Sequence, residues 1–368
     1  MRLTTNPASA LRGWTLTLIA LLVVAALPAA AEGEYFQPKP PMPEKFDWVQ
    51  MTSLEWLKGE LISMYDDSME FDSKEFDLQT LDFDDVQEVR SVGIMQVAFE
   101  DGTIAIGKIL IDKETVRVIG DEDQEFPRSK LLSITAGEPK EINYWSMKAS
   151  VGANFREGNT EQVETNGQIN LVRRTPRNRI NLDYLAAFNQ TDGDTAADNQ
   201  RASAGWNRYY SKRFYLSPVY GEWFRDPFVN IASRWTIGTG AGYQIIKKPK
   251  IKWDVTAGIG YQTTSFDSVE EGEPDSANTP ALLFSTVYDH DFTKWMEFLF
   301  SYKFQIVNEE SGTYNHHIET GLEFDLTTIL DFNITFIWDR IKNPRPDIAG
   351  IVPEQDDYRL VFFLGFDL

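Results

Sequence analysis

Cysteine is absent from this sequence of 368 residues, and histidine occurs only three times. Without cysteine the chain can form neither disulfides nor thiolate metal sites. Positive charge is also scarce: 35 Lys and Arg residues stand against 56 Asp and Glu residues, and the net charge of −21 argues against nonspecific nucleic-acid binding. No G-x-x-x-x-G-K-[ST] phosphate loop is present, and Gly238, Gly240 and Gly242 lie in a strand pattern rather than a dinucleotide fingerprint. The sequence therefore predicts no cofactor and no nucleic-acid partner.

Long apolar runs are missing except near the N-terminus, where residues 16–27 are almost entirely apolar. Arg2 and Arg12 precede this run, and three alanines at positions 29–31 follow it, as in a secretory signal peptide. The alternative is a retained membrane helix, but the run is short for a membrane span. We therefore predict that residues 1–31 are a signal peptide.

Residues 32–45 contain four prolines and form a predicted extended linker. The next region, residues 46–141, holds 23 acidic and 9 basic residues and so carries two-thirds of the net charge. It contains two halves of similar pattern, and a spacing of 48 residues aligns Gly59 with Gly107. This pattern predicts a small β domain made of two similar halves, each similar to Sm-like or SH3-like folds.

The acidic side chains of this domain leave several roles open. Asp82, Asp84 and Asp85 lack the spacing of an EF-hand calcium loop, so a solvated acidic face is favoured over a calcium site. A small periplasmic domain of this charge is also suited to bind a partner protein, peptidoglycan or the mouth of a barrel. The sequence does not choose among these three.

From Trp145 to Leu368, apolar and polar residues alternate in successive blocks, as on the two faces of β-strands. The last block places Tyr358, Leu360 and Phe362 on one face and Arg359 on the other. With the apolar face outward, residues 142–368 form a predicted twelve-stranded antiparallel transmembrane β-barrel. A soluble sandwich or ligand-binding barrel is the alternative, but its strands are shorter and its apolar face points inward. The expected strands are 144–156, 161–173, 179–190, 200–211, 213–225, 233–246, 251–264, 280–291, 295–307, 314–327, 331–341 and 357–368.

Short and long connections alternate between these strands. In bacterial barrels short turns face the periplasm and long loops the exterior, so both barrel ends and the acidic domain are expected in the periplasm. The short turns are rich in Lys and Arg, which suits anionic phospholipid headgroups. The loop of residues 265–279 is acidic, and it either bridges to lipopolysaccharide through divalent cations or is simply soluble, which we favour. Its acidic residues are Asp267, Glu270, Glu271, Glu273 and Asp275.

Several short motifs occur in order along the predicted barrel: Glu157-Gly158-Asn159-Thr160, Arg179-Ile180-Asn181-Leu182-Asp183-Tyr184, Arg225-Asp226, Gly240-Ala241-Gly242-Tyr243-Gln244 and Glu319-Thr320-Gly321-Leu322. Through them residues 144–368 resemble the salt-induced outer membrane protein family, also called domain of unknown function 481. The resemblance implies an outer-membrane barrel, with no established activity and no catalytic residues. Leu368 departs from the aromatic last residue usual in such barrels, although Phe366 keeps an aromatic two positions earlier.

The predicted lumen is the remaining place for chemistry. His317 shares a face with Glu319, and Ser301 lies on the neighbouring strand, but ordinary polar lining is favoured over a hydrolase. Charges of both signs either line a narrow channel or pair and plug it. The charged residues expected to point inward are Arg156, Glu164, Asp183, Arg201, Lys303, Glu323 and Asp325.

These features together predict an outer-membrane protein that is not an enzyme, with no catalytic, cofactor-binding or metal-binding residue to assign. Its function is expected to be a narrow channel, or, as the resemblance to the salt-induced family implies, an envelope protein of osmotic stress. The alternatives are an adaptor barrel whose acidic domain binds a periplasmic partner, and an outer-membrane hydrolase. The expected partners are outer-membrane lipid, lipopolysaccharide and the barrel assembly machinery.

Overall fold

The computed structural model describes residues 45–73, 75–137, 140–156, 162–191 and 194–367. The predicted signal peptide, the linker up to residue 44, the motif of residues 157–160 and Leu368 lie outside the described residues, as does the Arg156 side chain. Within those ranges, no helix combines the length and the apolar character that a membrane span requires.

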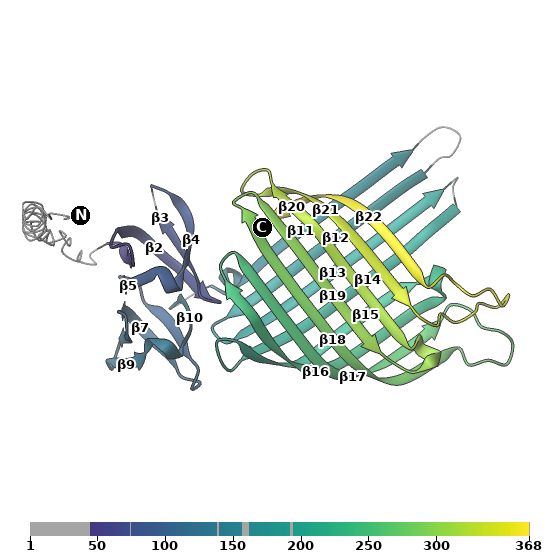
Figure 1. Cartoon of the computed structure of the whole chain (residues 1–368), viewed down its shortest axis with the longest axis horizontal. Helices are drawn as coiled ribbons and strands as arrows, with labels where there is room; N and C mark the ends of the chain where they lie inside the picture. The colour runs from purple at the N-terminus through teal and green to yellow at the C-terminus, as the bar shows by residue number, and fades with distance from the viewer. Residues whose placement is uncertain (1–44, 74, 138–139, 157–161, 192–193, 368) are drawn as a thin grey trace, which may run out of the picture. The chain divides into compact units, whose positions relative to one another are not determined.

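Twelve antiparallel strands close into a barrel in sequence order, and the last strand pairs with the first (Figure 1). The predicted count of twelve is therefore confirmed. Each ladder joins neighbours in the chain, and strands cross the barrel wall obliquely, as closure of a sheet requires. The strands are β11 (Trp145–Arg156), β12 (Gln162–Thr175), β13 (Asn178–Thr191), β14 (Asp194–Tyr209), β15 (Phe214–Asp226), β16 (Ile231–Lys248), β17 (Ile251–Phe266), β18 (Ser276–Thr293), β19 (Met296–Ile306), β20 (Tyr314–Asp325), β21 (Leu330–Ile341) and β22 (Asp356–Asp367).

The strands depart most from the predicted boundaries at the end of the barrel with the long connections. β14 begins at Asp194 rather than at residue 200, and β18 begins at Ser276 rather than at residue 280. The predicted loops 191–199 and 265–279 are therefore too long. These strand ends carry polar residues on both faces, so the ladder continues where apolar alternation has already stopped.

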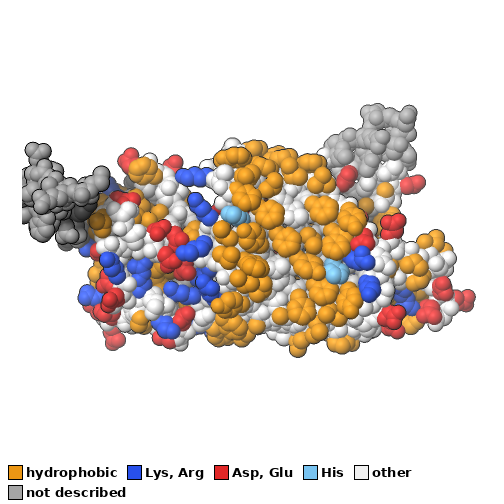
Figure 2. Space-filling model, in the orientation of Figure 1, with side chains coloured by type: hydrophobic (Ala, Val, Ile, Leu, Met, Phe, Trp, Pro, Cys, Tyr) orange, Lys and Arg blue, Asp and Glu red, His pale blue; other side chains and the backbone are white. Residues whose placement is uncertain are grey.

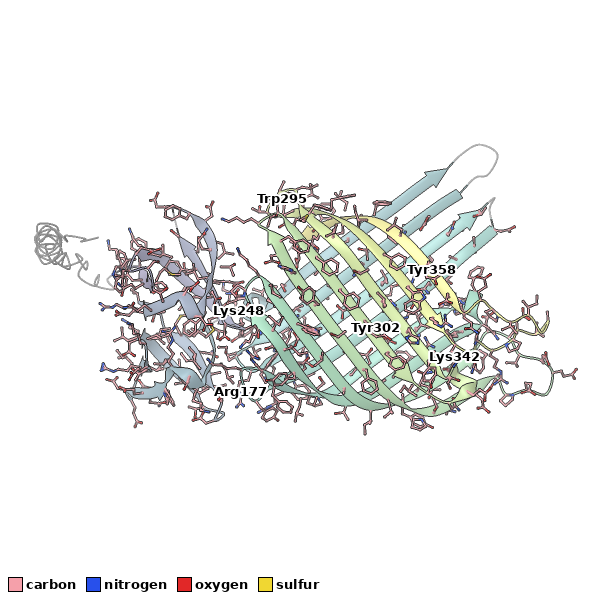
Figure 3. All side chains as sticks on the ribbon, viewed as in Figure 1. Arg177, Lys248, Trp295, Tyr302, Lys342 and Tyr358 are labelled. Atoms are coloured by element: carbon pink, nitrogen blue, oxygen red, sulfur yellow. The ribbon has the colours of Figure 1, made fainter. Side chains whose placement is uncertain are left out.

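An apolar band covers the outward face of the barrel (Figure 2). Leu360 and Ile237 are 59% and 62% exposed. The outward face predicted for the last strand, β22, is confirmed, and alternate apolar residues of β16 and β17 face outward as well. Trp295 lies at the end with the short turns and Tyr358 toward the other end (Figure 3), as interfacial aromatic side chains do. So much exposed apolar surface is stable only in lipid, and the molecule is accordingly an outer-membrane β-barrel.

Ten shorter strands precede the barrel and form one sheet in the order β1-β5-β7-β6-β10-β2-β3-β4, with β8 and β9 continuing from β7. The second half repeats the pairing of the first, because β1 faces β2 at Asp47 and Gly59, and β6 faces β7 at Met95 and Gly107. A Cβ on either glycine would overlap a carbonyl oxygen of the following strand. The strands are β1 (Asp47–Met51), β2 (Trp56–Tyr65), β3 (Ser68–Ser73), β4 (Asp77–Asp82), β5 (Val86–Arg90), β6 (Met95–Phe99), β7 (Ile104–Ile111), β8 (Thr115–Ile119), β9 (Gln124–Pro127) and β10 (Leu131–Ala136).

Both halves of this domain share a single hydrophobic core. Phe71 and Val89 from the first half pack in the same cluster as Phe99 and Ile109 from the second, and all four are fully buried. The halves also exchange strand pairings, since β5 pairs with β7 and β10 pairs with β2. Neither half can bury its apolar face alone, so the two fold as one unit. The likeness to Sm-like or SH3-like folds stays a prediction.

Candidate functional site in the barrel lumen

The inward side chains line a chamber of about 530 Å³. Arg201 and Lys303 border one end of it. The other end is bordered by Lys252, Asp289 and Asp66, the last of which lies in the turn between β2 and β3. Hydroxyl groups from six strands line the space between these ends: Ser203, Ser217, Thr256, Ser285, Ser301 and Thr335.

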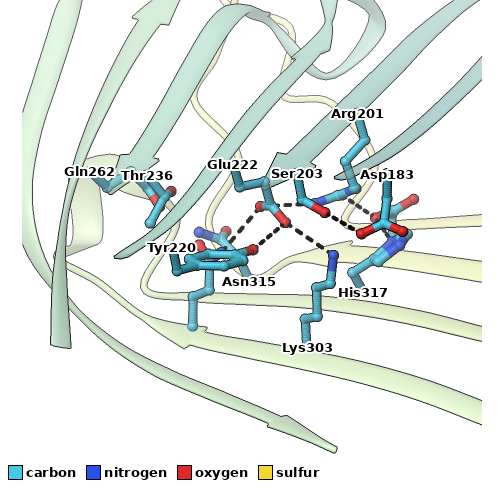
Figure 4. Close-up of polar contacts among 12 residues, drawn as sticks. Asp183, Arg201, Ser203, Tyr220, Glu222, Thr236, Gln262, Lys303, Asn315 and His317 are labelled. Atoms are coloured by element: carbon cyan, nitrogen blue, oxygen red, sulfur yellow. Dashed lines mark hydrogen bonds and ion pairs between the residues drawn. The ribbon is translucent and has the colours of Figure 1, made fainter. Parts of the chain in front are cut away.

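A network of ion pairs lies at the end of the chamber nearer the long loops (Figure 4). Arg201 places one nitrogen 3.0 Å from Glu222 and another 2.8 Å from Asp339. Lys303 approaches Glu222 to 3.6 Å, and Arg359 approaches Asp339 to 2.8 Å. The outer charge network, as we term it, consists of Arg201, Glu222, Lys303, His317, Glu319, Asp339 and Arg359. Because the side chains of Arg201 and Glu222 are only 7% and 2% exposed, each charge depends on its partners for stabilisation.

His317 is held in this network by both of its ring nitrogens. Nδ1 lies 2.8 Å from Asp339 and Nε2 lies 2.7 Å from Glu319. The predicted pairing of His317 with Glu319 is therefore confirmed. Both ring nitrogens are thus engaged by carboxylates, and no hydrogen bond among the described residues joins His317 to Ser301. The geometry therefore gives the hydrolase alternative no support.

Three long loops bind one another at the same end of the barrel. The side-chain nitrogen of Asn230 donates to the carbonyl oxygens of Arg345 and Pro346, at 3.2 Å and 2.8 Å. Its side-chain oxygen accepts from the backbone nitrogen of Ser268 at 2.9 Å. Glu273, from the acidic loop, pairs with Arg345 at 3.1 Å. One acidic side chain expected to face solvent or lipopolysaccharide therefore serves to fasten a loop.

At the opposite end, basic residues of the short turns bind the acidic domain. Arg174, at the end of β12, pairs with the buried carboxylate of Asp66, and its guanidinium lies 4.4 Å from the ring centre of Tyr65. Lys247 lies 3.6 Å from Asp67. All five residues belong to one compact unit that contains both the domain and the barrel. The turn between β2 and β3 thus brings two carboxylates to the mouth of the lumen.

Two further contacts extend this interface. Lys248, labelled in Figure 3, lies 2.6 Å from Asp84 and 3.3 Å from Asp82. The Ser133 hydroxyl donates to the carbonyl oxygen of Pro176 at 2.7 Å. We expected the basic turns to face phospholipid headgroups, whereas these lysines and Arg174 pair with carboxylates of the chain itself. The basic short turns and the acidic domain carry opposite charges, which favours this pairing, and two of the three aspartates considered for calcium bind a lysine instead.

The interface shifts the pKa values of the domain's carboxyl groups. Burial alone raises the pKa of Asp66, but the charges of Arg174, Lys247 and Arg179 outweigh burial and hold it well below its usual value. The hydrogen bond from Lys248 likewise lowers the pKa of Asp84. Both carboxylates are therefore more stable in the ionised form when the domain is bound than when it is free.

Acidification is expected to loosen the domain from the barrel. A carboxyl group with a depressed pKa contributes stability that is complete above its unperturbed value, here 3.8, and is lost as the pH falls below it. Because the chain lacks cysteine, spin labels at Lys113→Cys and Lys294→Cys report the separation specifically. We expect one narrow distance distribution at pH 7 and a broad one at pH 3, with circular dichroism showing whether the domain stays folded. The same distribution at both pH values would contradict the expectation.

The predicted inward charges divide between the two parts of the lumen. Arg201 and Lys303 belong to the outer charge network, whereas Asp183 and Glu323 line the chamber. Glu164 accepts a hydrogen bond from Asn166 at 3.2 Å on its own strand. Asp325 shares the inward face of β20 with Glu323, but it is the last residue of that strand and is exposed. The Arg156 side chain lies outside the described residues.

The sequence did not single out Asp339 and Arg359, although Asp339 contacts three other members of the network. Their partners lie on other strands, and the register that brings them together cannot be derived from alternation alone. A signal was nevertheless present, because both residues fall on the inward face of a predicted strand.

The model of the family described as "Protein of unknown function, DUF481" matches residues 149–368, which confirms the resemblance derived from the motifs. No protein of curated function matches the sequence. Among solved structures, the NanC porin is 6% identical with a TM-score of 0.37, covering 61% of this chain and 98% of its own. The translocator domain of the autotransporter NalP from Neisseria meningitidis is 10% identical with a TM-score of 0.34, covering 60% and 86%. The COG4313 outer membrane channel from Pseudomonas putida F1 is 10% identical with a TM-score of 0.35, covering 61% and 94%.

Proposed function

The chain belongs to the DUF481 family of proteins of unknown function, and from this premise we propose that it is a narrow, gated channel for small hydrophilic solutes in the outer membrane. The observation that carries the proposal is the chamber of about 530 Å³, which side chains do not fill and which has ion pairs at both ends. We propose that these ion pairs form an outer and an inner closure. Eight-stranded barrels are filled by side chains and sixteen-stranded barrels leave a wide channel, so twelve strands suit a narrow path.

The outer closure is built entirely from side chains. Arg201, Glu222 and Asp339 come from three different strands, and each is bound to at least two other charged groups. When an arginine side chain leaves one carboxylate and pairs with another, the backbone hydrogen bonds between the strands stay intact. Opening therefore requires the rearrangement of ion pairs and of the loops fastened by Asn230, without unfolding of the barrel.

The inner closure is the turn between β2 and β3, which we propose lies on the periplasmic side. Short turns face the periplasm in bacterial outer-membrane barrels, and this turn binds the end of the barrel that carries them. Asp66 and Asp67 then act as a removable stopper, held by Arg174 and Lys247. We favour this role over an adaptor role for the domain, because Asp66 and Asp67 already pair with the barrel and are therefore not free to bind a separate partner protein.

The proposal is tested by current through planar bilayers containing the purified full-length protein. We expect a small current with brief openings from the wild type and a larger one from Arg201→Met. Heat-modifiable gel mobility verifies that each sample is folded, and heat-denatured protein serves as the control. No current from either folded protein would overturn the proposed channel.

A further inference from the structure

The carboxylates inside the barrel are unevenly distributed between its two ends. On the inward face of β17 to β21, toward the short turns, acidic residues follow one another from strand to strand. Glu297 lies directly opposite Glu323 on one neighbouring strand and opposite Asp291 on the other. Like charges in such positions repel one another unless something neutralises them. We term Asp254, Asp289, Glu297 and Glu323 the acidic arc.

Lys148, Lys252 and Arg179 line the chamber beside the acidic arc, and Lys252 lies directly opposite Asp289 in the β17–β18 ladder. Lys148 is shared, because it binds Glu323 and also lies 3.3 Å from Asp331 and 3.9 Å from Asp367. In the part of the chain that the structure describes, no Lys, Arg or His nitrogen lies within 4 Å of the carboxylates of Asp254, Asp289 or Glu297. The outer charge network differs, since there each carboxylate has a close cationic partner. The carboxylates that have no paired cation thus lie at the short-turn end.

Two buried amide oxygens that face carboxylates of the acidic arc also lack a partner in the described part of the chain. Gln244 is 2% exposed and lies opposite Asp254 in the β16–β17 ladder, and its Oε1 has no hydrogen-bond donor among the described residues. Asn333 lies opposite Glu323, and its Oδ1 also lacks a donor within those residues. Both residues line the chamber. Oxygen atoms that are buried without donors cost free energy unless a cation or water binds them.

We propose that the lumen selects small cations over anions and that the acidic arc, with the amide oxygens of Gln244 and Asn333, is its selectivity filter. This inference rests on the proposed channel and names the class of solute that passes. Rings of Asp and Glu side chains raise the local concentration of cations, and the low dielectric of a barrel wall strengthens their field. Asp66, in the turn at this mouth, is paired with Arg174 and does not belong to the filter.

The same arrangement favours passage over tight binding. No group of three or more carboxylate or histidine side chains in the described residues is arranged to hold a metal ion. Conduction requires sites that attract an ion and still release it, which separate carboxylates along a wall provide and a closed ligand cage does not. The solutes that fit are therefore monovalent inorganic cations and small organic ammonium ions.

The test is the reversal potential of the full-length protein in a planar bilayer across a tenfold KCl gradient. We expect the wild type to reverse close to the potassium equilibrium potential. The variant Asp254→Asn/Asp289→Asn/Glu297→Gln removes three charges from the arc, and we expect its K⁺/Cl⁻ permeability ratio to fall severalfold toward one. The matched control, Glu270→Gln/Glu271→Gln/Asp275→Asn, removes three charges from an exposed loop and is expected to behave as the wild type.

A conservative variant, Asp289→Glu/Glu297→Asp, guards against misfolding, because it keeps the charges and is expected to keep the preference. Current without cation preference in the wild type would overturn this inference and leave the proposed channel standing. An unchanged ratio in the triple variant would overturn the acidic arc as the filter. No current from any of the folded proteins would overturn the proposed channel and this inference together.

Discussion

Replacing Arg174 with alanine is expected to release the acidic domain from the barrel and to raise the current. The substitution removes the ion-pair partner of Asp66, whose carboxylate would then be buried at the barrel mouth with Lys247 as its nearest remaining cation. It also removes the guanidinium that stacks on Tyr65. Breaking a buried ion pair costs about 3 kcal/mol, or roughly a hundredfold in the docking equilibrium.

The spin-label pair at Lys113→Cys and Lys294→Cys measures this release directly. Arg174→Ala should turn a narrow distance distribution into a broad one at pH 7, and bilayer currents should rise in the same samples. The neighbouring Arg173 offers a matched control, because it pairs with the exposed Glu141 instead. The Nε atom of Arg173 lies 2.6 Å from Oε1 of Glu141. Exposed pairs contribute little, so Arg173→Ala should change neither readout. If the two variants behave alike, the inner closure is not built as we describe.

Arg201→Met is expected to destabilise the barrel and to open the outer closure. Methionine keeps most of the side-chain volume but leaves Glu222 and Asp339 without the cation that joins them. Lys303 remains beside Glu222, and Arg359 and His317 remain beside Asp339, so the bridge across the lumen is lost while each acid keeps a partner. The expected loss in free energy of unfolding is about 3 kcal/mol, because the pair is buried.

Urea titration of the barrel in lipid vesicles, followed by gel mobility, measures the loss in stability, and bilayer recording measures the current. The double variant Arg201→Met/Glu222→Gln should regain part of the stability, since it removes a buried charge together with its partner. Arg340→Met is the control, because Arg340 pairs with Asp356 and is one-third exposed. A stable, non-conducting Arg201→Met protein would show that the network is not the barrier.

Much of the barrel could be predicted because the residues of each membrane strand alternate, and this alternation shows which face of the strand contacts lipid. Tyr358, Leu360 and Phe362 alternate with Arg359 and Val361, and that pattern alone identifies the face toward lipid. The start of β14 could not be predicted, since Asp194, Thr195 and Asp198 show no apolar face there. Beyond the membrane, backbone hydrogen bonds alone hold neighbouring strands together, and these bonds form whatever the side chains are. The sequence therefore gives no signal for where such a strand begins.

The candidate site was predicted only where its members are close in sequence. His317 and Glu319 share one strand face and were paired correctly. Asp339 is 22 residues from His317, and its place beside that ring depends on the register of β20 and β21. The acidic domain and the basic turns were each recognised by charge, and binding at the barrel mouth was one of three roles left open.

The sequence by itself determined that the chain has a twelve-stranded wall with its apolar face outward and an acidic domain before it. These properties follow from local alternation and from charge counts, which do not depend on distant contacts. Only the tertiary structure decided which charges pair, that ion pairs lie at both ends of the chamber, and that carboxylates without a paired cation lie at one end. Ion pairs across a lumen depend on strand register and barrel closure, so they exist only once the whole sheet has closed.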